Sequence, residues 1–253
     1  MEFVQITPHY VNNFLMKNRI ALLLFGHMRT YNECFQSLKV NLIDLLNPDI
    51  FIHTWDEIES TTTSWHKANM ENHIINSEEK RNIKQLYKPK KIYFENQKKA
   101  DKKSEILING MSLKGQKFMM YSLFKANEMK INYENTHNIS YDIVIKLRPD
   151  ILLKEPITKF FNEDKYLDNQ VHLCGNKVKF GRKISSYRAL DIIMMSNSKT
   201  MNLVANFYNK SDEYLSRDLF KHSSFVDYLL EQELNIKINK YNYGKKWIIK
   251  RSV

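Results

Sequence analysis

The sequence predicts an α/β fold in which a single Rossmann-like, mostly parallel central sheet is flanked by helices. Three observations predict it. Residues 19–25 and 49–55 are apolar runs separated by a glycine turn and a helical pattern, which together make a βαβ unit. Residues 141–150 form a third run, Tyr-Asp-Ile-Val-Ile-Lys-Leu-Arg-Pro-Asp, whose β-branched residues are typical of a strand covered on both faces. A charged pair, Arg148 and Asp150, ends that third run, and Pro149 between them favours the end of the strand.

The first half of the chain supplies the elements in alternating order. Apolar residues recur at helical spacing from Asn32 to about Leu46, which predicts a helix between the first two strands. A long polar loop, or a loop with a short helix, is expected at 56–72. Ser77 is the expected N-cap of a second helix reaching about Leu86, with Lys80 where Glu or Gln would complete a capping box. A short strand at 91–95 and a surface loop at 97–104 should follow.

In the second half the pattern of helix and strand continues. A helix is predicted from Gln116 to about Tyr133, because one broad face is apolar and no Gly or Pro interrupts it. Further strands are expected, at 151–153, 171–174 and 191–196, and the basic stretch 175–189 should connect the last two. Asn197 or Ser198 should cap a helix through Tyr208, and a last helix is expected at 224–234.

Composition favours one folded domain over residues 1–253, with a lead-in at 1–18 and a basic tail at 235–253. The 253 residues are 43% hydrophobic and 12% aromatic, which argues against disorder. No apolar run approaches the roughly 18 residues that cross a bilayer, and the first twenty residues do not resemble a signal peptide. Cys34 and Cys174 are too few and too far apart for a disulfide framework, so we expect two small buried hydrophobes in a cytoplasmic protein.

The formal charge of +11 raises nucleic acid, anionic lipid and polyphosphate as partners. Solvated loop lysines are the simplest explanation of the basic clusters at 88–91, 98–103 and 245–246. The functional alternative is peripheral docking on an acidic membrane surface.

Polar residues at the ends of the predicted strands are the candidates for chemistry, because ligands of open α/β sheets bind outside the carboxyl ends of strands. Gly26 permits a tight turn or a close ligand approach, and Arg29 offers a planar donor fork; a plain turn with an exposed arginine is the alternative. His53 and Trp55 end the second strand. Trp55 either stacks on a base or caps the sheet. His53 is either a ligand contact or a core histidine. Arg148 and Asp150 are either a surface ion pair or the site of a charged ligand.

These motifs, taken in order, resemble bacterial and large-virus surface-polysaccharide glycosyltransferases with a nucleotide-diphospho-sugar transferase (GT-A type) fold. The residues that carry the resemblance are 20–31, with Cys34 and Ser37 following, then 49–55 and 141–150. The resemblance implies a nucleotide-sugar donor and a glycan or lipid-linked acceptor. It places Gly26, His27, Arg29, His53 and Trp55 near the nucleotide.

The chain departs from that family at the metal site. Many such enzymes have Asp-x-Asp at this strand end to hold Mg²⁺ or Mn²⁺, whereas Arg148 stands at the first acidic position here. Two alternatives follow: Asp150 alone completes a metal site with phosphates and waters, or Arg148 itself neutralises the leaving diphosphate. Asp191 is the candidate for the general base that deprotonates the acceptor hydroxyl, or for a residue that binds the donor sugar. The alternative is a structural role, as a strand residue hydrogen-bonded to a loop.

Two rival functions remain from the sequence alone. A basic nucleic-acid-binding module would explain the charge, although no motif for base recognition is present, which makes nucleic acid the weaker partner. A nucleotidyltransferase of related fold would share the elements and differ in the group transferred. The basic stretch 175–189, which includes Arg182, Lys183 and Arg188, is either a phosphate clamp or an ordinary loop.

Overall fold

The computed structural model describes part of the chain, and the fold is given for that part. The described residues are 18–59, 72–100, 107–108, 111–112, 114–160, 168–180, 183–216, 234–242 and 247–250. Within these ranges only the backbone is described for 174–180 and 183–191, among other positions.

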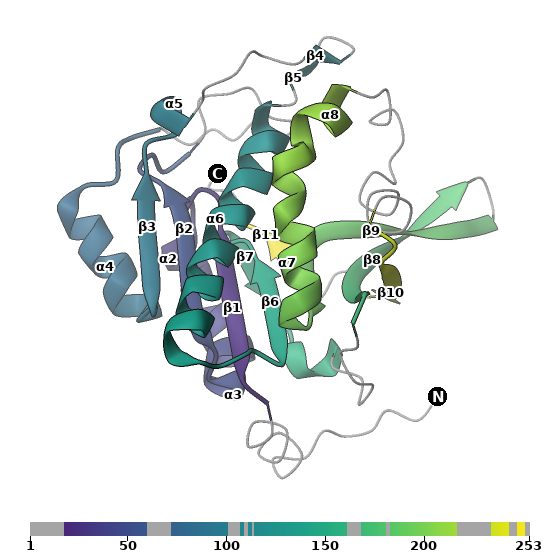
Figure 1. The fold of residues 1–253 in the computed structure, drawn as a ribbon, viewed down its shortest axis with the longest axis horizontal. Helices are drawn as coiled ribbons and strands as arrows, with labels where there is room; N and C mark the ends of the chain where they lie inside the picture. The colour runs from purple at the N-terminus through teal and green to yellow at the C-terminus, as the bar shows by residue number, and fades with distance from the viewer. Residues whose placement is uncertain are drawn as a thin grey trace.

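A seven-stranded sheet runs through the centre in the order β10-β8-β9-β6-β1-β2-β3 (Figure 1). Four neighbouring strands are parallel and have the bounds β1 Ile20–Phe25, β2 Asp49–Trp55, β3 Lys91–Glu95 and β6 Ile143–Leu147. The other three are β8 Gln170–Phe180, β9 Lys183–Ser196 and β10 Lys237–Asn242. Strand β9 is antiparallel to both β6 and β8, and β10 is parallel to β8. The predicted fold class, a mostly parallel sheet between helices, is confirmed.

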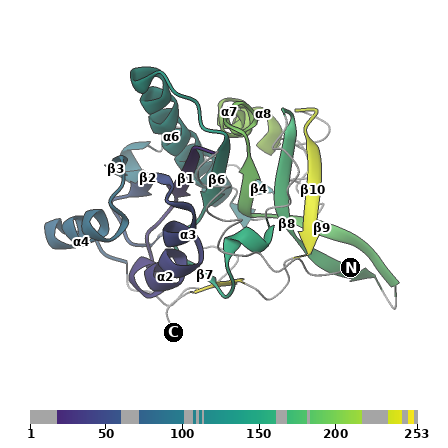
Figure 2. The same ribbon diagram turned by 90° about the horizontal axis from the view of Figure 1, so that it is seen from below.

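Helices cover both faces of this sheet (Figure 2). One face carries α2 Tyr31–Leu38, which continues through the π-helical turn Lys39–Ile43 into α3 Asp44–Leu46. The other face carries the long α6 Lys114–His137, α7 Ser198–Asn206 and, after a 3-10 turn at Phe207–Lys210, α8 Ser211–Ser216. Helix α4 Ser77–Tyr87 lies beside the β3 edge. The smaller elements are α5 Gln97–Ala100, the pair β4 Leu107–Ile108 and β5 Met111–Ser112, a 3-10 turn at Ile157–Phe160, and the pair β7 Ile151–Leu153 with β11 Trp247–Ile249.

Strand β1 shows why the central strands are mostly apolar. Leu22 and Leu24 belong to the core under α2, while Leu23 and Phe25 belong to the core under α6. Successive side chains of a strand point to opposite faces, so a strand with a helix layer on each side has no polar face. All six residues of β1 are buried.

The start of α4 differs from the prediction by one residue. Asn76, not Ser77, is the N-cap: its backbone is extended, and its side chain accepts hydrogen bonds from the backbone N–H groups of Glu78 and Glu79. The Glu79 side chain accepts in return from the Asn76 N–H, which completes a capping box. The shift removes the anomaly of Lys80 at the third helical position. The N-cap of α7 is Asn197, which was one of the two residues predicted for this position.

Two predicted loops contain regular structure. The described part of the stretch 175–189 does not form a connector but belongs to the long antiparallel pair of β8 and β9, whose outer half extends beyond the rest of the sheet in Figure 1. Its backbone pairing comes from the neighbouring strand and needs no buried apolar face, so the sequence pattern did not reveal it. Residues Gln97–Ala100, expected as surface loop, form α5, and the Gln97 side chain is buried. The helix expected at 224–234 lies almost entirely outside the described residues.

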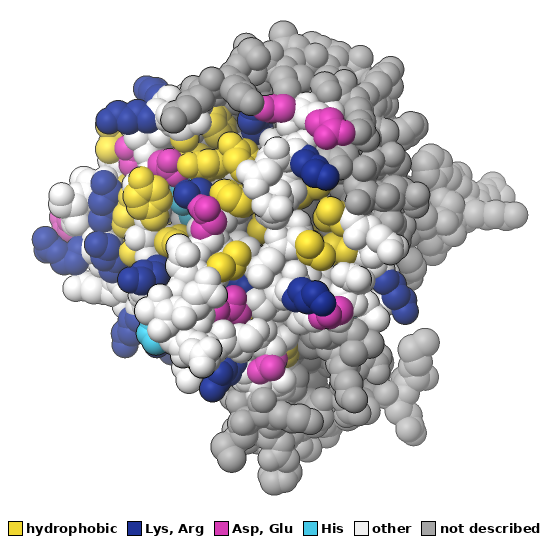
Figure 3. Space-filling view, viewed as in Figure 1, with side chains coloured by type: hydrophobic (Ala, Val, Ile, Leu, Met, Phe, Trp, Pro, Cys, Tyr) yellow, Lys and Arg dark blue, Asp and Glu magenta, His cyan; other side chains and the backbone are white. Residues whose placement is uncertain are grey.

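The described part of the predicted C-terminal tail is built into the fold, because β10 joins the main sheet and β11 pairs with β7. Among the described helices, none combines the length and apolar character that crossing a membrane requires. Figure 3 shows Lys and Arg spread over one face, especially around the α4 and β3 edge, with acidic side chains between them.

Candidate functional site

The strand ends singled out from the sequence meet at one rim of the sheet. Because β1, β2, β3 and β6 are parallel and adjacent, the residues that follow them lie at the same edge. Strand β9 runs the opposite way, with Ile193 opposite Leu147, so the backbone of Asp191 also reaches this rim. The Asp191 side chain lies outside what the structure describes, and its catalytic role stays a prediction.

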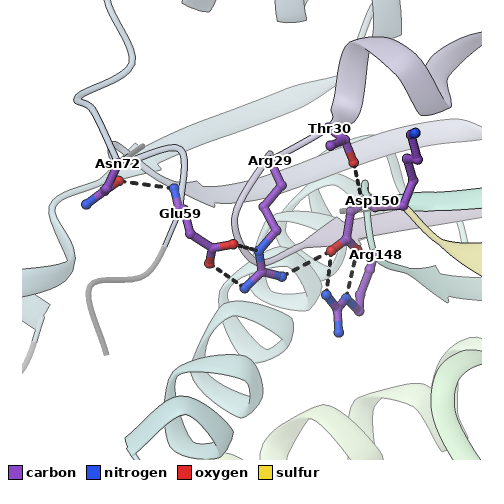
Figure 4. Close-up of polar contacts among 7 residues, drawn as sticks. Arg29, Thr30, Glu59, Asn72, Arg148 and Asp150 are labelled. Atoms are coloured by element: carbon purple, nitrogen blue, oxygen red, sulfur yellow. Dashed lines mark hydrogen bonds and ion pairs between the residues drawn. The ribbon is translucent and has the colours of Figure 1, made fainter. Parts of the chain in front are cut away.

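An ion-pair network connects three of these strand ends (Figure 4). The Asp150 carboxylate accepts from Arg148 through Nε at 2.9 Å and Nη2 at 2.5 Å, and from Arg29 Nη1 at 3.1 Å. Arg29 turns its other side to Glu59, donating from Nε at 2.6 Å and from Nη2 at 2.7 Å. Arg148 and Asp150 are therefore not an isolated surface pair, because Asp150 is the buried centre of a four-residue network.

The backbone holds Arg29 in position for this network. Its φ of 44° lies in the left-handed region, which non-glycine residues seldom adopt. The Arg29 N–H donates to the Ile58 carbonyl at 3.0 Å, and Glu59 N–H donates to Asn72 Oδ1 at 3.2 Å. Two strand-end loops, after β1 and after β2, are thus fixed to each other where Arg29 meets Glu59.

Electrostatic interactions keep Asp150 and Arg29 charged. Burial alone would raise the pKa of Asp150, but Arg148 and then Arg29 outweigh it and hold that pKa below its ordinary value. Burial would lower the pKa of Arg29, and the bonds to Glu59 and Asp150 reverse that effect. The Asp150 carboxylate and the Arg29 guanidinium therefore face each other as ions at neutral pH.

The described donor set does not fit a metal ion at Asp150. Both carboxylate oxygens already accept hydrogen bonds from guanidinium groups, and the side chain is 0% exposed. Two cations next to those oxygens oppose a divalent ion by Coulomb repulsion. Among the described residues, no group of three or more His, Cys, Asp or Glu side chains is placed to hold a metal ion.

A polar chain lies directly beneath the rim. The Gly26 N–H donates to Ser122 Oγ at 2.7 Å, and that hydroxyl lies 2.8 Å from His53 Nδ1. The other ring nitrogen of His53 is 2.8 Å from Glu95 Oε2, and Tyr121 donates to Glu95 Oε1 at 2.8 Å. Burial lowers the pKa of His53, so the neutral ring donates to Glu95 and accepts from Ser122. This chain ties the turn at Gly26, whose φ is +95°, to helix α6.

His53 and Trp55 are placed in the interior and not on the surface of the rim. His53 is 0% exposed and Trp55 is 1% exposed. Trp55 stacks on Tyr121 at a ring separation of 5.7 Å and meets Phe118 edge-on at 5.3 Å. Their surroundings give both residues a supporting position under the site, which is the alternative noted for each in the sequence. Direct contact with a nucleotide, as predicted, is untested.

His27 lies just above this layer, with its ring 6.3 Å from that of Trp55. Burial, followed by the positive charge of Arg29, lowers the pKa of His27 to about 3. The ring is therefore neutral throughout the physiological range.

The C-terminal strand closes the rim from the side of β7. The Lys250 N–H donates to the Asp150 carbonyl at 2.8 Å, and the Lys250 carbonyl accepts from Thr30 Oγ1 at 2.5 Å. This segment joins the ends of β1 and β6 to each other through two backbone groups.

The structure thus brings together Gly26, His27, Arg29, Arg148 and Asp150, with His53 and Trp55 beneath them. Sequence reasoning missed Glu59, Glu95, Gln97 and Ser122. For Glu95 and Gln97 a usable signal existed, because both lie at the end of a predicted strand. Glu59 lies in an irregular loop and Ser122 on a helix face, so neither a strand-end position nor hydrophobic spacing identifies them.

Comparisons with known proteins concern the fold. No protein-family model and no curated protein matches the sequence. Among solved structures, the chain is similar to a glycosyltransferase involved in glycosylation of the major capsid of PBCV-1, with 10% identity over 88% of this chain and 81% of that one and a TM-score of 0.39. It is similar to an active-site mutant of LgtC, with 14% identity over 88% and 72% and a TM-score of 0.45. Mouse xyloside xylosyltransferase 1 gives 11% identity over 88% and 84%, with a TM-score of 0.43.

These similar structures are GT-A type glycosyltransferases. At such identities the likeness is one of fold alone.

Proposed function

We propose that the protein is a glycosyltransferase that moves a sugar from a nucleotide-sugar donor to a glycan or lipid-linked acceptor in surface-polysaccharide synthesis. Two things support the proposal: the sequence motifs at residues 20–31, 49–55 and 141–150, and the meeting of their ends at one rim. The single observation that carries it is the pair of guanidinium groups, from Arg29 and Arg148, oriented by buried Asp150.

The arginine pair suits the departing nucleoside diphosphate. In the reaction the acceptor oxygen bonds to the anomeric carbon, the bond from that carbon to phosphate breaks, and its electron pair stays on the diphosphate. Arg148 donates its Nε–H and one N–H of Nη2 to Asp150. Its Nη1 group remains to donate to a ligand. A guanidinium held by a carboxylate needs little reorganisation to stabilise that developing charge.

The remaining roles follow the same rim. Gly26 and His27 would contact the nucleotide, because they follow β1 beside Arg29. Asp191, whose backbone reaches the rim, would take the acceptor hydroxyl proton or grip the donor sugar. Of the two alternatives for the diphosphate, we propose the arginine one, and any Mg²⁺ or Mn²⁺ would be held by donor phosphates and not by Asp150. A cytoplasmic location and a peripheral contact with anionic membrane remain predictions of the sequence.

Thermal shift and donor hydrolysis test this proposal. The protein is incubated with a panel of nucleotide sugars and nucleoside diphosphates, each with Mn²⁺ and with a chelator. We expect at least one nucleoside diphosphate to raise the unfolding temperature in the presence of the chelator. The matching nucleotide sugar should be hydrolysed slowly or transferred.

Arg148→Met is the informative variant, with Arg81→Met on the exposed face of α4 as its control. We expect Arg148→Met to lose most of the nucleotide-induced shift, and Arg81→Met to keep it. If no nucleoside diphosphate shifts the wild-type protein under either condition, the proposed function is wrong. A shift seen only with Mn²⁺ would retain the transferase and reject the arginine alternative.

A further inference from the structure

Glu59 and Arg29 form a two-point ion pair of the kind that arginine also forms with phosphate. The Glu59 carboxylate accepts from Arg29 Nε at 2.6 Å and from Arg29 Nη2 at 2.7 Å. A guanidinium recognises carboxylate and phosphate groups through this same pair of parallel hydrogen bonds. Glu59 therefore occupies the edge of Arg29 that a ligand phosphate would need in order to bind in this way.

The corresponding edge of Arg148 is filled by Asp150, but the two carboxylates are not held in the same way. Asp150 is 0% exposed and accepts from both guanidinium groups, and its backbone carbonyl accepts from the Lys250 N–H at 2.8 Å. Glu59 lies on the side of Arg29 that faces away from Asp150 (Figure 4). Displacing Glu59 would thus free one edge of Arg29 and leave the contacts of Asp150 in place.

The formal charges of this network cancel, which matters for a ligand as acidic as a diphosphate. Arg29 and Arg148 are the cations of its ion pairs, and Glu59 and Asp150 are the anions. A carboxylate held against a guanidinium repels an incoming phosphate and offsets the attraction of the cation. The arginine pair becomes a strongly cationic site only when one carboxylate moves aside.

The backbone around Glu59 is anchored, so that its side chain is the part that can move. The Arg29 N–H donates to the Ile58 carbonyl at 3.0 Å, and the Ile58 N–H donates to the His73 carbonyl at 3.0 Å. The Glu59 N–H donates to Asn72 Oδ1 at 3.2 Å. A change of side-chain rotamer at Glu59 would release Arg29 and keep all three of these hydrogen bonds.

We propose that Glu59 is an internal competitor for phosphate. In the ligand-free protein its carboxylate orients Arg29 and fills the phosphate position on that guanidinium, and it moves aside when a diphosphate binds. Only molecules in which Glu59 has released Arg29 bind with full affinity, so the ion pair lowers the apparent affinity of the wild-type protein. The inference rests on the proposed function and adds a residue that opposes ligand binding.

Calorimetric titration of the full chain tests the inference. The ligands are inorganic pyrophosphate and the diphosphates of uridine, guanosine, cytidine and adenosine. Glu59→Gln is the informative variant, because it nearly keeps the shape of the side chain and removes its negative charge. Its Oε1 still accepts a hydrogen bond from Arg29, but a neutral acceptor competes less well with phosphate.

Glu57→Gln is the matched control. Glu57 is also buried and lies two residues away in the same loop, where it accepts from Asn72 Nδ2 at 2.8 Å and lies 3.8 Å from Lys98 Nζ. The control therefore removes the same charge from the same part of the molecule without touching the ion pair of Arg29 and Glu59. Urea unfolding of both variants confirms that they fold.

We expect Glu59→Gln to bind pyrophosphate, and the nucleoside diphosphate that wild type prefers, about tenfold more tightly than wild type. Glu57→Gln should bind like wild type. Equal or weaker binding by Glu59→Gln would overturn the inference, because Glu59 would then only support Arg29. An equal gain in both variants would also overturn it, because a general change of charge would explain the gain. Either result would leave the proposed function standing. If neither wild type nor Glu59→Gln binds any of these ligands, both the inference and the proposed function fail.

Discussion

Replacing Asp150 by Asn should destabilise the fold more than any other conservative change at the rim. The carboxylate is 0% exposed and accepts three hydrogen bonds from two guanidinium groups, at 2.5, 2.9 and 3.1 Å. Asn keeps the shape, but it removes the negative charge and turns an N–H₂ group towards one of the arginines. The change removes the carboxylate that Arg148 donates to and leaves Arg29 with Glu59 alone.

The magnitude follows from the burial of the network. Removing one partner of a buried ion pair costs about 3–5 kcal/mol, because the remaining charge stays buried without compensation. Arg148 and Arg29 keep 19% and 11% of their side chains exposed, so water can relieve part of that cost. We therefore expect a loss of about 3 kcal/mol in the free energy of unfolding, the lower end of that range.

Urea unfolding at pH 7 measures this loss, with Asp168→Asn as the control. Asp168 also pairs with a cation, Lys199, but it is exposed, so its removal should change the midpoint little. The two arginines outweigh burial and lower the pKa of Asp150, so its contribution is complete above the ordinary aspartate pKa of about 4. It should be lost as the pH falls below that value, and the gap between wild type and Asp150→Asn should then narrow. A loss under about 1 kcal/mol at pH 7 with an unchanged m-value would refute the buried network.

Two further predictions concern the layers around the site. Burial lowers the pKa of His27 to about 3, below the 6.5 of an unfolded histidine, so the folded protein binds fewer protons and stability falls as pH drops below about 6.5. Relative to wild type, the free energy of unfolding of His27→Phe should therefore rise by up to about 1.4 kcal/mol as the pH falls from 6 to 5, measured by urea unfolding. A difference between the two proteins that does not change with pH would contradict this prediction. Asn76→Ala should cost about 1 kcal/mol, because it removes the cap of α4, whereas Ser77→Ala should cost a few tenths at most. Equal effects in thermal unfolding would show that the cap is assigned wrongly.

The central strands could be predicted from the sequence. The largely apolar runs at 19–25, 49–55 and 141–150 form β1, β2 and β6, because a strand between two helix layers buries both of its faces. The long helix α6 was equally clear, although it extends to Lys114–His137. The β8–β9 hairpin was not, because its outer strands are marked by pairing and not by a hydrophobic period.

The site divides in the same way. The sequence by itself determined that Gly26, Arg29, Arg148 and Asp150 end strands, and the rule for parallel sheets then placed them at one rim. Tertiary structure alone decided that Glu59 orients Arg29. It also put Asp150 between two arginines and out of reach of solvent. Which charge pairs with which depends on distances of a few ångströms between segments about 30 and 120 residues apart, and no local pattern of residues records such distances.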